Sequence, residues 1–71
     1  MNTLPQDRNT MNATITTKYI STHYGTRSEY VARAELGTWW KEKSFRDYSA
    51  AVEWCEWRAR DQLAVLQLSF A

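Results

Sequence analysis

The chain of 71 residues has one cysteine, one histidine, one proline and two glycines. With Cys55 alone, an internal disulfide is excluded, and a reducing cytoplasm is the simpler setting. Two separate glycines do not make the glycine-rich loop that binds phosphate groups, and no nucleophile motif is present. The scarcity of these residue types therefore excludes disulfide scaffolds and phosphate-binding loops.

An excess of charge is also missing. Nine Lys and Arg residues stand against eight Asp and Glu residues, which leaves a net charge of +1. This balance argues against nonspecific nucleic-acid binding, which needs many uncompensated cations on one surface. No apolar run approaches the roughly 20 residues that span a bilayer, and the N-terminus has no signal-peptide pattern. We therefore expect a soluble, cytoplasmic protein without a membrane partner.

The side chains that could carry chemistry are isolated from one another. A metal site needs two or more ligands at fixed spacing, and His23 is far from Cys55 in the sequence. A reactive thiol needs exposure and a lowered pKa, whereas Cys55 falls on the buried side of a predicted helix. The acidic residues form no pair placed for acid–base work. We expect no catalytic residue, no metal site and no cofactor, and therefore a protein that is not an enzyme.

Residues 1–12 are rich in Asn, Thr, Gln and Asp and contain the only proline. This composition predicts a disordered leader, followed by one small domain over residues 13–71. Met11, just before the regular pattern begins, is an alternative start. A domain of this size has a small core, so a partner or a homodimer that hides apolar surface would stabilise it.

Three segments have the β-branched and aromatic composition of strands: residues 14–24, 27–36 and 39–45. They are separated by Gly25-Thr26 and Gly37-Thr38. A glycine at the first position of a two-residue loop suits a type II′ hairpin turn. Two such turns, twelve residues apart, predict an antiparallel β-meander.

The two turns also predict a register, with Tyr24 opposite Arg27, Ile15 opposite Leu36, and Leu36 opposite Trp39. One face of the sheet is then mainly apolar: Ile15, Tyr19, Tyr30, Ala32, Ala34, Leu36, Trp39 and Phe45. The other face is mixed: Lys18, Ile20, Tyr24, Val31, Arg33, Glu35, Trp40 and Glu42. Lys41 and Lys43 point inward on the third strand, where lysines oppose edge-to-edge pairing.

A helix follows, with Asp47 or Ser49 as its cap and its end near Arg60. Its buried stripe consists mainly of small side chains: Tyr48, Ala51, Val52, Cys55 and Ala59. The apolar alternation in residues 63–70 favours a fourth strand, and continuation of the helix is the rival. We therefore predict an α+β fold, βββα or βββαβ, in which a three- or four-stranded antiparallel meander packs on one helix.

Four tryptophans are more than a core of this size holds. Trp39 is expected in the core and Trp54 half-buried beside it. Trp40 and Trp57 are left over, and the tail or the leader could cover one of them. As exposed side chains they would be anchors for a partner, because Trp, Tyr and Arg dominate binding hot spots. The predicted partner-binding residues are Trp40, Trp57, Tyr24, Arg33, Lys18 and Arg27.

The segment 40–54 joins a strand ending in Phe45 to a helix that carries alanines and Trp54. This layout resembles the strand-to-helix junction of DNA-binding modules of the plant AP2 type and of phage integrase arm-binding domains. The resemblance implies a three-stranded sheet that reads the major groove. Here, however, glutamates interrupt the cations of the would-be reading face, at Glu29, Glu35 and Glu42.

In size, single-sheet layout and polar leader, the chain also resembles small phage-encoded accessory proteins, above all anti-CRISPR inhibitors. That resemblance implies a non-enzymatic factor in the host cytoplasm that blocks a host protein complex by steric occlusion. We take this as the leading hypothesis and a DNA-binding module that uses the open sheet as its rival. Salt separates them, because only phosphate contacts weaken steeply as salt rises.

Overall fold

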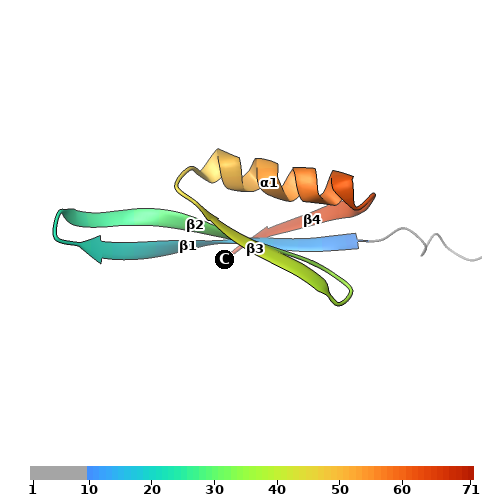
Figure 1. Cartoon of the computed structure of the whole chain (residues 1–71), viewed down its shortest axis with the longest axis horizontal. Coiled ribbons are helices and arrows are strands. Elements are labelled where there is room, and N and C mark those ends of the chain that lie inside the picture. Colours follow the sequence, from blue (N-terminus) through green and yellow to red (C-terminus); the bar gives the residue numbers. More distant parts are fainter. Residues whose placement is uncertain (1–9) are drawn as a thin grey trace, which may run out of the picture.

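Three strands follow one another along the chain and pair antiparallel, β1 (Thr10–Thr22) with β2 (Gly25–Leu36) and β2 with β3 (Trp39–Phe45). The helix α1 (Tyr48–Asp61) comes next and leads to β4 (Val65–Phe70). The computed structural model describes residues 10–71, and Figure 1 shows α1 lying across one face of the sheet. The predicted α+β class, with one helix on a single sheet, is confirmed.

The sheet is mixed rather than wholly antiparallel, and this corrects the prediction. The strand order is β3-β2-β1-β4, and β4 runs parallel to β1. Because β3 also runs in the direction of β1, the chain must cross over the sheet between β3 and β4. Parallel strands need such a crossover, and α1 supplies it. The fourth strand over the tail is therefore confirmed, and continuation of the helix is wrong.

The way α1 ends explains why the sequence of residues 63–70 was compatible with both a strand and a longer helix. The N–H of Leu63 donates to the carbonyl of Arg60 at 3.1 Å, and the N–H of Ala64 donates to the carbonyl of Ala59 at 2.8 Å. Leu63 has φ 53°, in the left-handed region. These are the two hydrogen bonds of a Schellman motif, which usually has glycine at the left-handed position. Leucine stands there instead, so the sequence has no visible stop signal.

The helix begins at Tyr48, with Asp47 at the N-cap position. The Asp47 side chain makes no capping hydrogen bond to the helix backbone. Instead its carboxylate accepts a hydrogen bond of 2.9 Å from the hydroxyl of Ser49.

Within the described residues 10–71, no helix combines the length and the apolar composition that a membrane span needs.

The first strand starts earlier than predicted. β1 begins at Thr10, and Met11 is fully buried against the core. Residues 10–12 of the predicted leader therefore belong to the sheet, where they pair with β4. Residues 1–9 of that leader lie outside the described residues.

The first hairpin turns two residues before the predicted position. Thr22 pairs with Gly25, so the loop is His23-Tyr24, and neither loop residue has positive φ. The hydroxyl of Thr22 donates to the carbonyl of Gly25 at 2.9 Å and accepts from the N–H of Tyr24 at 3.1 Å. Gly25 follows the turn with φ 121°. Gly25 is therefore the first residue after the loop and not, as predicted, the first residue of the loop.

The change of turn shifts the register but preserves the faces. Ile15 lies opposite Ala32 and not opposite Leu36. The partner moves by an even number of residues, so every strand residue keeps its predicted side of the sheet. The second hairpin has the predicted register, with Leu36 opposite Trp39 and φ 61° at Gly37.

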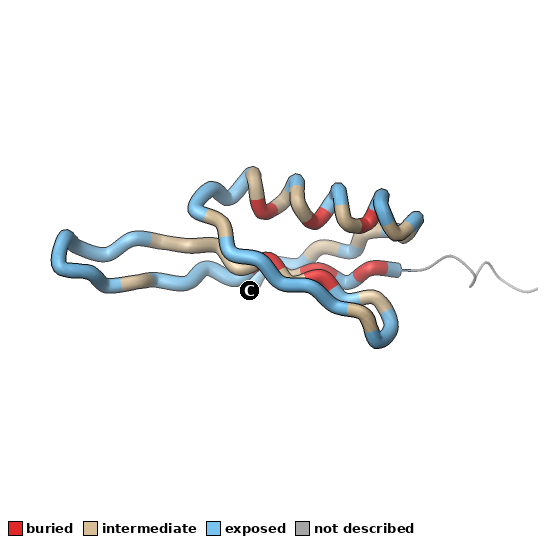
Figure 2. The backbone as a smooth tube through the Cα atoms, viewed as in Figure 1, coloured by how far each residue is buried: buried red, intermediate tan, exposed pale blue. Residues whose placement is uncertain are grey.

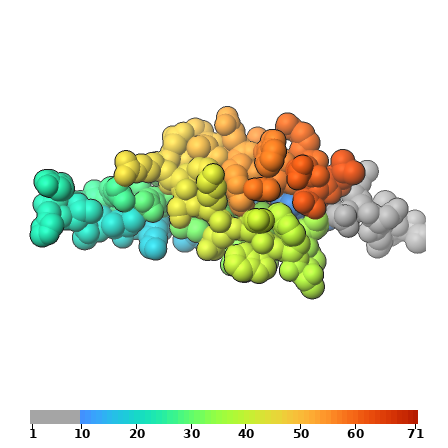
Figure 3. All heavy atoms as spheres, in the orientation of Figure 1, coloured from blue at the N-terminus to red at the C-terminus, as the bar shows by residue number. Residues whose placement is uncertain are grey.

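The β1–β2 hairpin extends beyond the rest of the sheet. Pairing with β4 ends at Ile15 and pairing with β3 ends at Tyr30. The segment 16–29 is therefore a two-stranded arm, which projects past α1 at the left of Figures 1 and 3. Tyr19, predicted on the apolar face, lies on this arm and is 72% exposed because the helix does not reach it.

The core lies between α1 and the sheet, where Figure 2 shows the buried positions, and most of its side chains are small. The buried residues are Met11, Ala13, Ile15, Ala32, Ala34, Ala51, Cys55 and Ala59. The alanines of β2 lie beneath the small stripe of α1, which lets the helix sit close to the strands. Trp54 is partly buried at the margin of this core, as predicted. Trp39, predicted in the core, is also only partly buried at its margin.

Candidate functional site

One face of the sheet carries α1, and within residues 10–71 no element covers the other (Figure 1). Side chains alternate between the two faces of a strand, so the neighbours of the buried alanines point to this uncovered face. We call it the open face. Its charged residues are Lys18, Arg27, Glu29, Arg33, Glu35 and Glu42.

On the open face, Arg33 stacks on the ring of Trp40. The guanidinium carbon of Arg33 lies 4.2 Å from the ring centroid of Trp40. The same guanidinium donates hydrogen bonds to Glu35 at 2.7 Å and to Glu42 at 3.5 Å. The hydrogen bond to Glu35 is the largest influence that raises the pKa of Arg33 above its ordinary value. Trp40 nevertheless remains 53% exposed, so its ring is both held in place and accessible.

The remaining cations of the open face lie on the arm. Arg27 is bonded to Glu29 at 3.2 Å, and Lys18 lies opposite Glu29 in the register of β1 and β2. The open face thus has three cations, at positions 18, 27 and 33, and three glutamates, at positions 29, 35 and 42. The open face has a balanced charge rather than a positive one.

The predicted partner-binding residues fall in three places. Trp40 and Arg33 are in contact, and Lys18 and Arg27 lie on the same face further along the sheet. Tyr24 was expected on the strand face but lies in the hairpin loop at the end of the arm, where it is 99% exposed.

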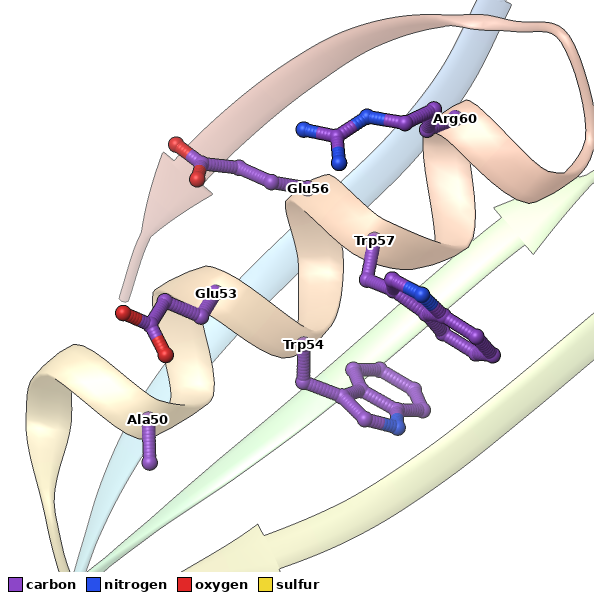
Figure 4. Close-up of a pocket in the computed structure, with 6 residues that line it drawn as sticks. All are labelled: Ala50, Glu53, Trp54, Glu56, Trp57 and Arg60. Carbon is purple, nitrogen blue, oxygen red and sulfur yellow. The ribbon is translucent and has the colours of Figure 1, made fainter.

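Trp57 is in the other layer, on α1, and is as exposed as Trp40. Figure 4 shows Trp57 and Trp54 extending from the same side of the helix, at an open depression of about 530 Å³. The guanidinium carbon of Arg58 lies 5.4 Å from the ring centroid of Trp54 and 5.1 Å from that of Trp57. This second aromatic cluster is built from one turn of one helix.

Sequence reasoning missed partly buried Arg58 and two exposed aromatic side chains, Tyr19 and Phe70. Arg58 lies four residues after Trp54, a spacing that places two side chains on one side of a helix, so the pair could have been found. Tyr19 is exposed because of the length of the arm. Phe70, at the end of β4, is 60% exposed and contacts Tyr48 with 5.9 Å between the ring centroids. The local sequence does not indicate that the side chain of Tyr19 or of Phe70 is exposed.

The groups with the most reactive chemistry are kept apart. Cys55 is buried on the side of α1 that faces the sheet. Desolvation, followed by the charge of Glu56, raises the pKa of its thiol. His23 is exposed in the hairpin loop, at the far end of the molecule. Among residues 10–71, no three His, Cys, Asp or Glu side chains gather as metal ligands would.

Comparisons of this chain with protein-family models, with curated proteins and with solved structures found no match. The resemblances to sheet-reading DNA-binding modules and to phage-encoded inhibitors therefore stay predictions.

Proposed function

We propose that the protein is a non-enzymatic accessory factor that binds another protein through its open face, with Trp40 at the centre of the contact. The observation that carries this proposal is the Arg33–Trp40 stack, fixed by two carboxylates on an uncovered sheet. The mode is steric occlusion of a host protein complex, as the resemblance to phage-encoded inhibitors implies.

The energetics of interfaces support this proposal. Binding hot spots are enriched in Trp, Tyr and Arg, and rigid anchors lose less conformational entropy on binding. Arg33 already holds Trp40 before any partner arrives. The uncharged indole can then be desolvated, while the glutamates beside it stay paired with Arg33 at the rim.

The charge of the open face disfavours the rival function. A DNA-binding sheet needs cations that are free to neutralise phosphates. Arg27 and Arg33 are both bonded to glutamates of the same face, which would lie next to the phosphate backbone. Duplex recognition would have to break these ion pairs and bring the carboxylates close to DNA.

The experiment is a pull-down from host lysate with the tagged protein, treated with nuclease and repeated at increasing salt. The matched variants are Trp40→Ala and Trp57→Ala, which remove the same side chain at the same 53% exposure from opposite layers. We expect a stoichiometric protein that survives nuclease and salt, is lost with Trp40→Ala and is kept with Trp57→Ala.

Two results would contradict the proposal. Loss of the bound protein with Trp57→Ala alone would move the contact to α1. Recovery of nucleic acid alone, released as salt rises, would favour the DNA-binding module.

A further inference from the structure

The two edges of the sheet differ in charge. β3 forms one edge and carries Lys41, Glu42 and Lys43 in its centre. β4 forms the other edge, and its sequence VLQLSF has neither a charge nor a proline. Proteins usually block exposed edges with lysine or proline, because an open edge pairs readily with another strand. By this criterion β3 is protected and β4 is open to pairing.

The backbone groups that β4 presents at this edge follow from one hydrogen bond. The N–H of Ala71 donates to the carbonyl of Ile15 at 3.1 Å, so Ala71 directs its backbone groups toward β1. Successive residues of a strand direct their N–H and C=O groups to alternate sides. Leu66, Leu68 and Phe70 therefore direct theirs to the outer edge, where no residue of the described part of the chain pairs with them.

We infer that β4 is a dimerisation strand, which pairs antiparallel with β4 of a second copy of this chain about a two-fold axis at Leu68. In this register Leu68 lies opposite Leu68 of the second copy, and Leu66 lies opposite its Phe70. Each opposed pair exchanges two backbone hydrogen bonds, as narrow antiparallel pairs do. A two-fold axis at Gln67 would instead leave the outward groups of Phe70 without a partner in β4.

Charge and exposure favour a second copy as the occupant. The edge strand has no charge, so its own copy meets it without like-charge repulsion, and the net charge of +1 adds little at long range. The pairing would also cover apolar surface, since Phe70 is 60% and Val65 44% exposed. Residues directly opposite each other point to the same face, so Phe70 would meet Leu66 of the second copy on the helix side.

The dimer bears on the proposed function without depending on it. Same-face pairing continues one sheet across the two-fold axis and places both helices on one side. The two Arg33–Trp40 stacks then lie together on the other side. Such a dimer presents two anchors to a partner, and a partner with two matching sites would bind with avidity.

The first measurement is the mass of the protein in solution by light scattering, from about 10 μM to about 1 mM, a range that includes weak dimers. We expect a transition from monomer to dimer. The variant Gln67→Lys/Ser69→Lys changes two exposed positions on the open face that lie opposite each other across the proposed axis. Like charges directly opposite are destabilising, so we expect the dissociation constant to rise about tenfold.

The matched control is Gln67→Lys/Ser69→Glu. In the proposed register each new lysine faces a new glutamate, and the dimer should be at least as tight as the wild-type dimer. With the axis at Gln67, by contrast, the two lysines would face each other and this variant would dimerise more weakly. Ser44→Lys, on the open face of β3, should leave the equilibrium unchanged.

Hydrogen exchange tests the proposal without any substitution. The amides of Leu66, Leu68 and Phe70 should exchange more slowly as protein concentration rises. A chain that stays monomeric at about 1 mM would overturn the proposal. So would a dimer that both double variants leave unchanged, which would place the interface elsewhere. Amides that are protected at concentrations where the mass is that of a monomer would show that another segment of the same chain covers the edge, and would also overturn it.

Discussion

The ring of Trp40 is covered on one side by the guanidinium of Arg33, at 4.2 Å, while about half of its surface stays open to solvent. Trp54, by contrast, packs against Phe45 at the core margin, with 6.0 Å between the ring centroids. The two indoles lie on opposite sides of the same edge of the sheet. Trp40 is accessible on the open face, as the proposed partner contact requires, and Trp54 supports the fold at the margin of the core.

We therefore expect Trp40→Ala to lower the free energy of unfolding by less than about 1 kcal/mol, because exposed side chains contribute little to stability. Trp54→Ala should cost about 2–4 kcal/mol, because it leaves a cavity between α1 and β3. Urea unfolding, followed by the circular dichroism of the helix, measures both. A loss above about 2 kcal/mol for Trp40→Ala would show that Trp40 belongs to the core and would remove it as an anchor.

The left-handed residue at the end of α1 gives a second prediction. Leu63 has φ 53° and is 88% exposed, so it bears the steric cost of this conformation and gains little from burial. Leu63→Gly should raise the free energy of unfolding by about 0.5–1 kcal/mol, as glycine adopts this conformation without strain. The control is Gln62→Gly, where φ is −94° and the added chain entropy should lower stability. A loss of stability with Leu63→Gly would mean that the leucine side chain has a packing role.

Most features of this fold that depend on residues close together in the sequence were predictable, and those that depend on residues far apart in the sequence were not. The second hairpin was predicted residue by residue, because glycine at its first loop position fixes both turn and register. At the first hairpin Thr22 makes the turn and Gly25 follows it, and Gly25-Thr26 alone does not distinguish the two arrangements. The faces were still correct because apolar alternation constrains them independently of the turn.

Other features could not be read locally. The partner of β4 is β1, which lies at the other end of the chain, and no local signal encodes a pairing of that range. Met11 was placed in the leader because its neighbours are polar, yet the pairing of β1 with β4 buries it. The exposure of Trp40 and Trp57 was predictable from the small size of the core. The stacking of Arg33 on Trp40 required the register of β2 and β3.

Two adjacent alanines of α1 test the close approach of helix and sheet. Ala51 is fully buried above the alanines of β2, whereas Ala50 is only partly buried and lines the open depression beside Trp54. Ala51→Leu should cost about 1–3 kcal/mol, because the extra volume pushes the helix off the sheet. Ala50→Leu should change stability by less than about 0.5 kcal/mol. If the two variants were equally stable, measured by thermal unfolding, the helix would not be packed closely at this point.

The last prediction concerns the pH dependence of stability at the buried thiol. Burial raises the pKa of Cys55 above its ordinary value of 9.0, so the folded protein holds this proton more tightly than the unfolded chain. The stability that this contributes is fully present below pH 9 and is lost as the pH rises through the folded pKa.

The test compares wild type with Cys55→Ala in urea unfolding between pH 7 and pH 10.5. The alanine variant should be less stable by about 1 kcal/mol at pH 7, because it lacks the buried sulfur. This difference in the free energy of unfolding should shrink above pH 9. There the thiol of the unfolded wild type ionises while the buried thiol stays protonated, which lowers the stability of the wild type alone. The two proteins share every other side chain, so the comparison isolates the contribution of Cys55. A difference that stays constant to pH 10.5, or a native thiol that reacts with a thiol reagent as fast as the unfolded chain, would show that Cys55 is accessible to water.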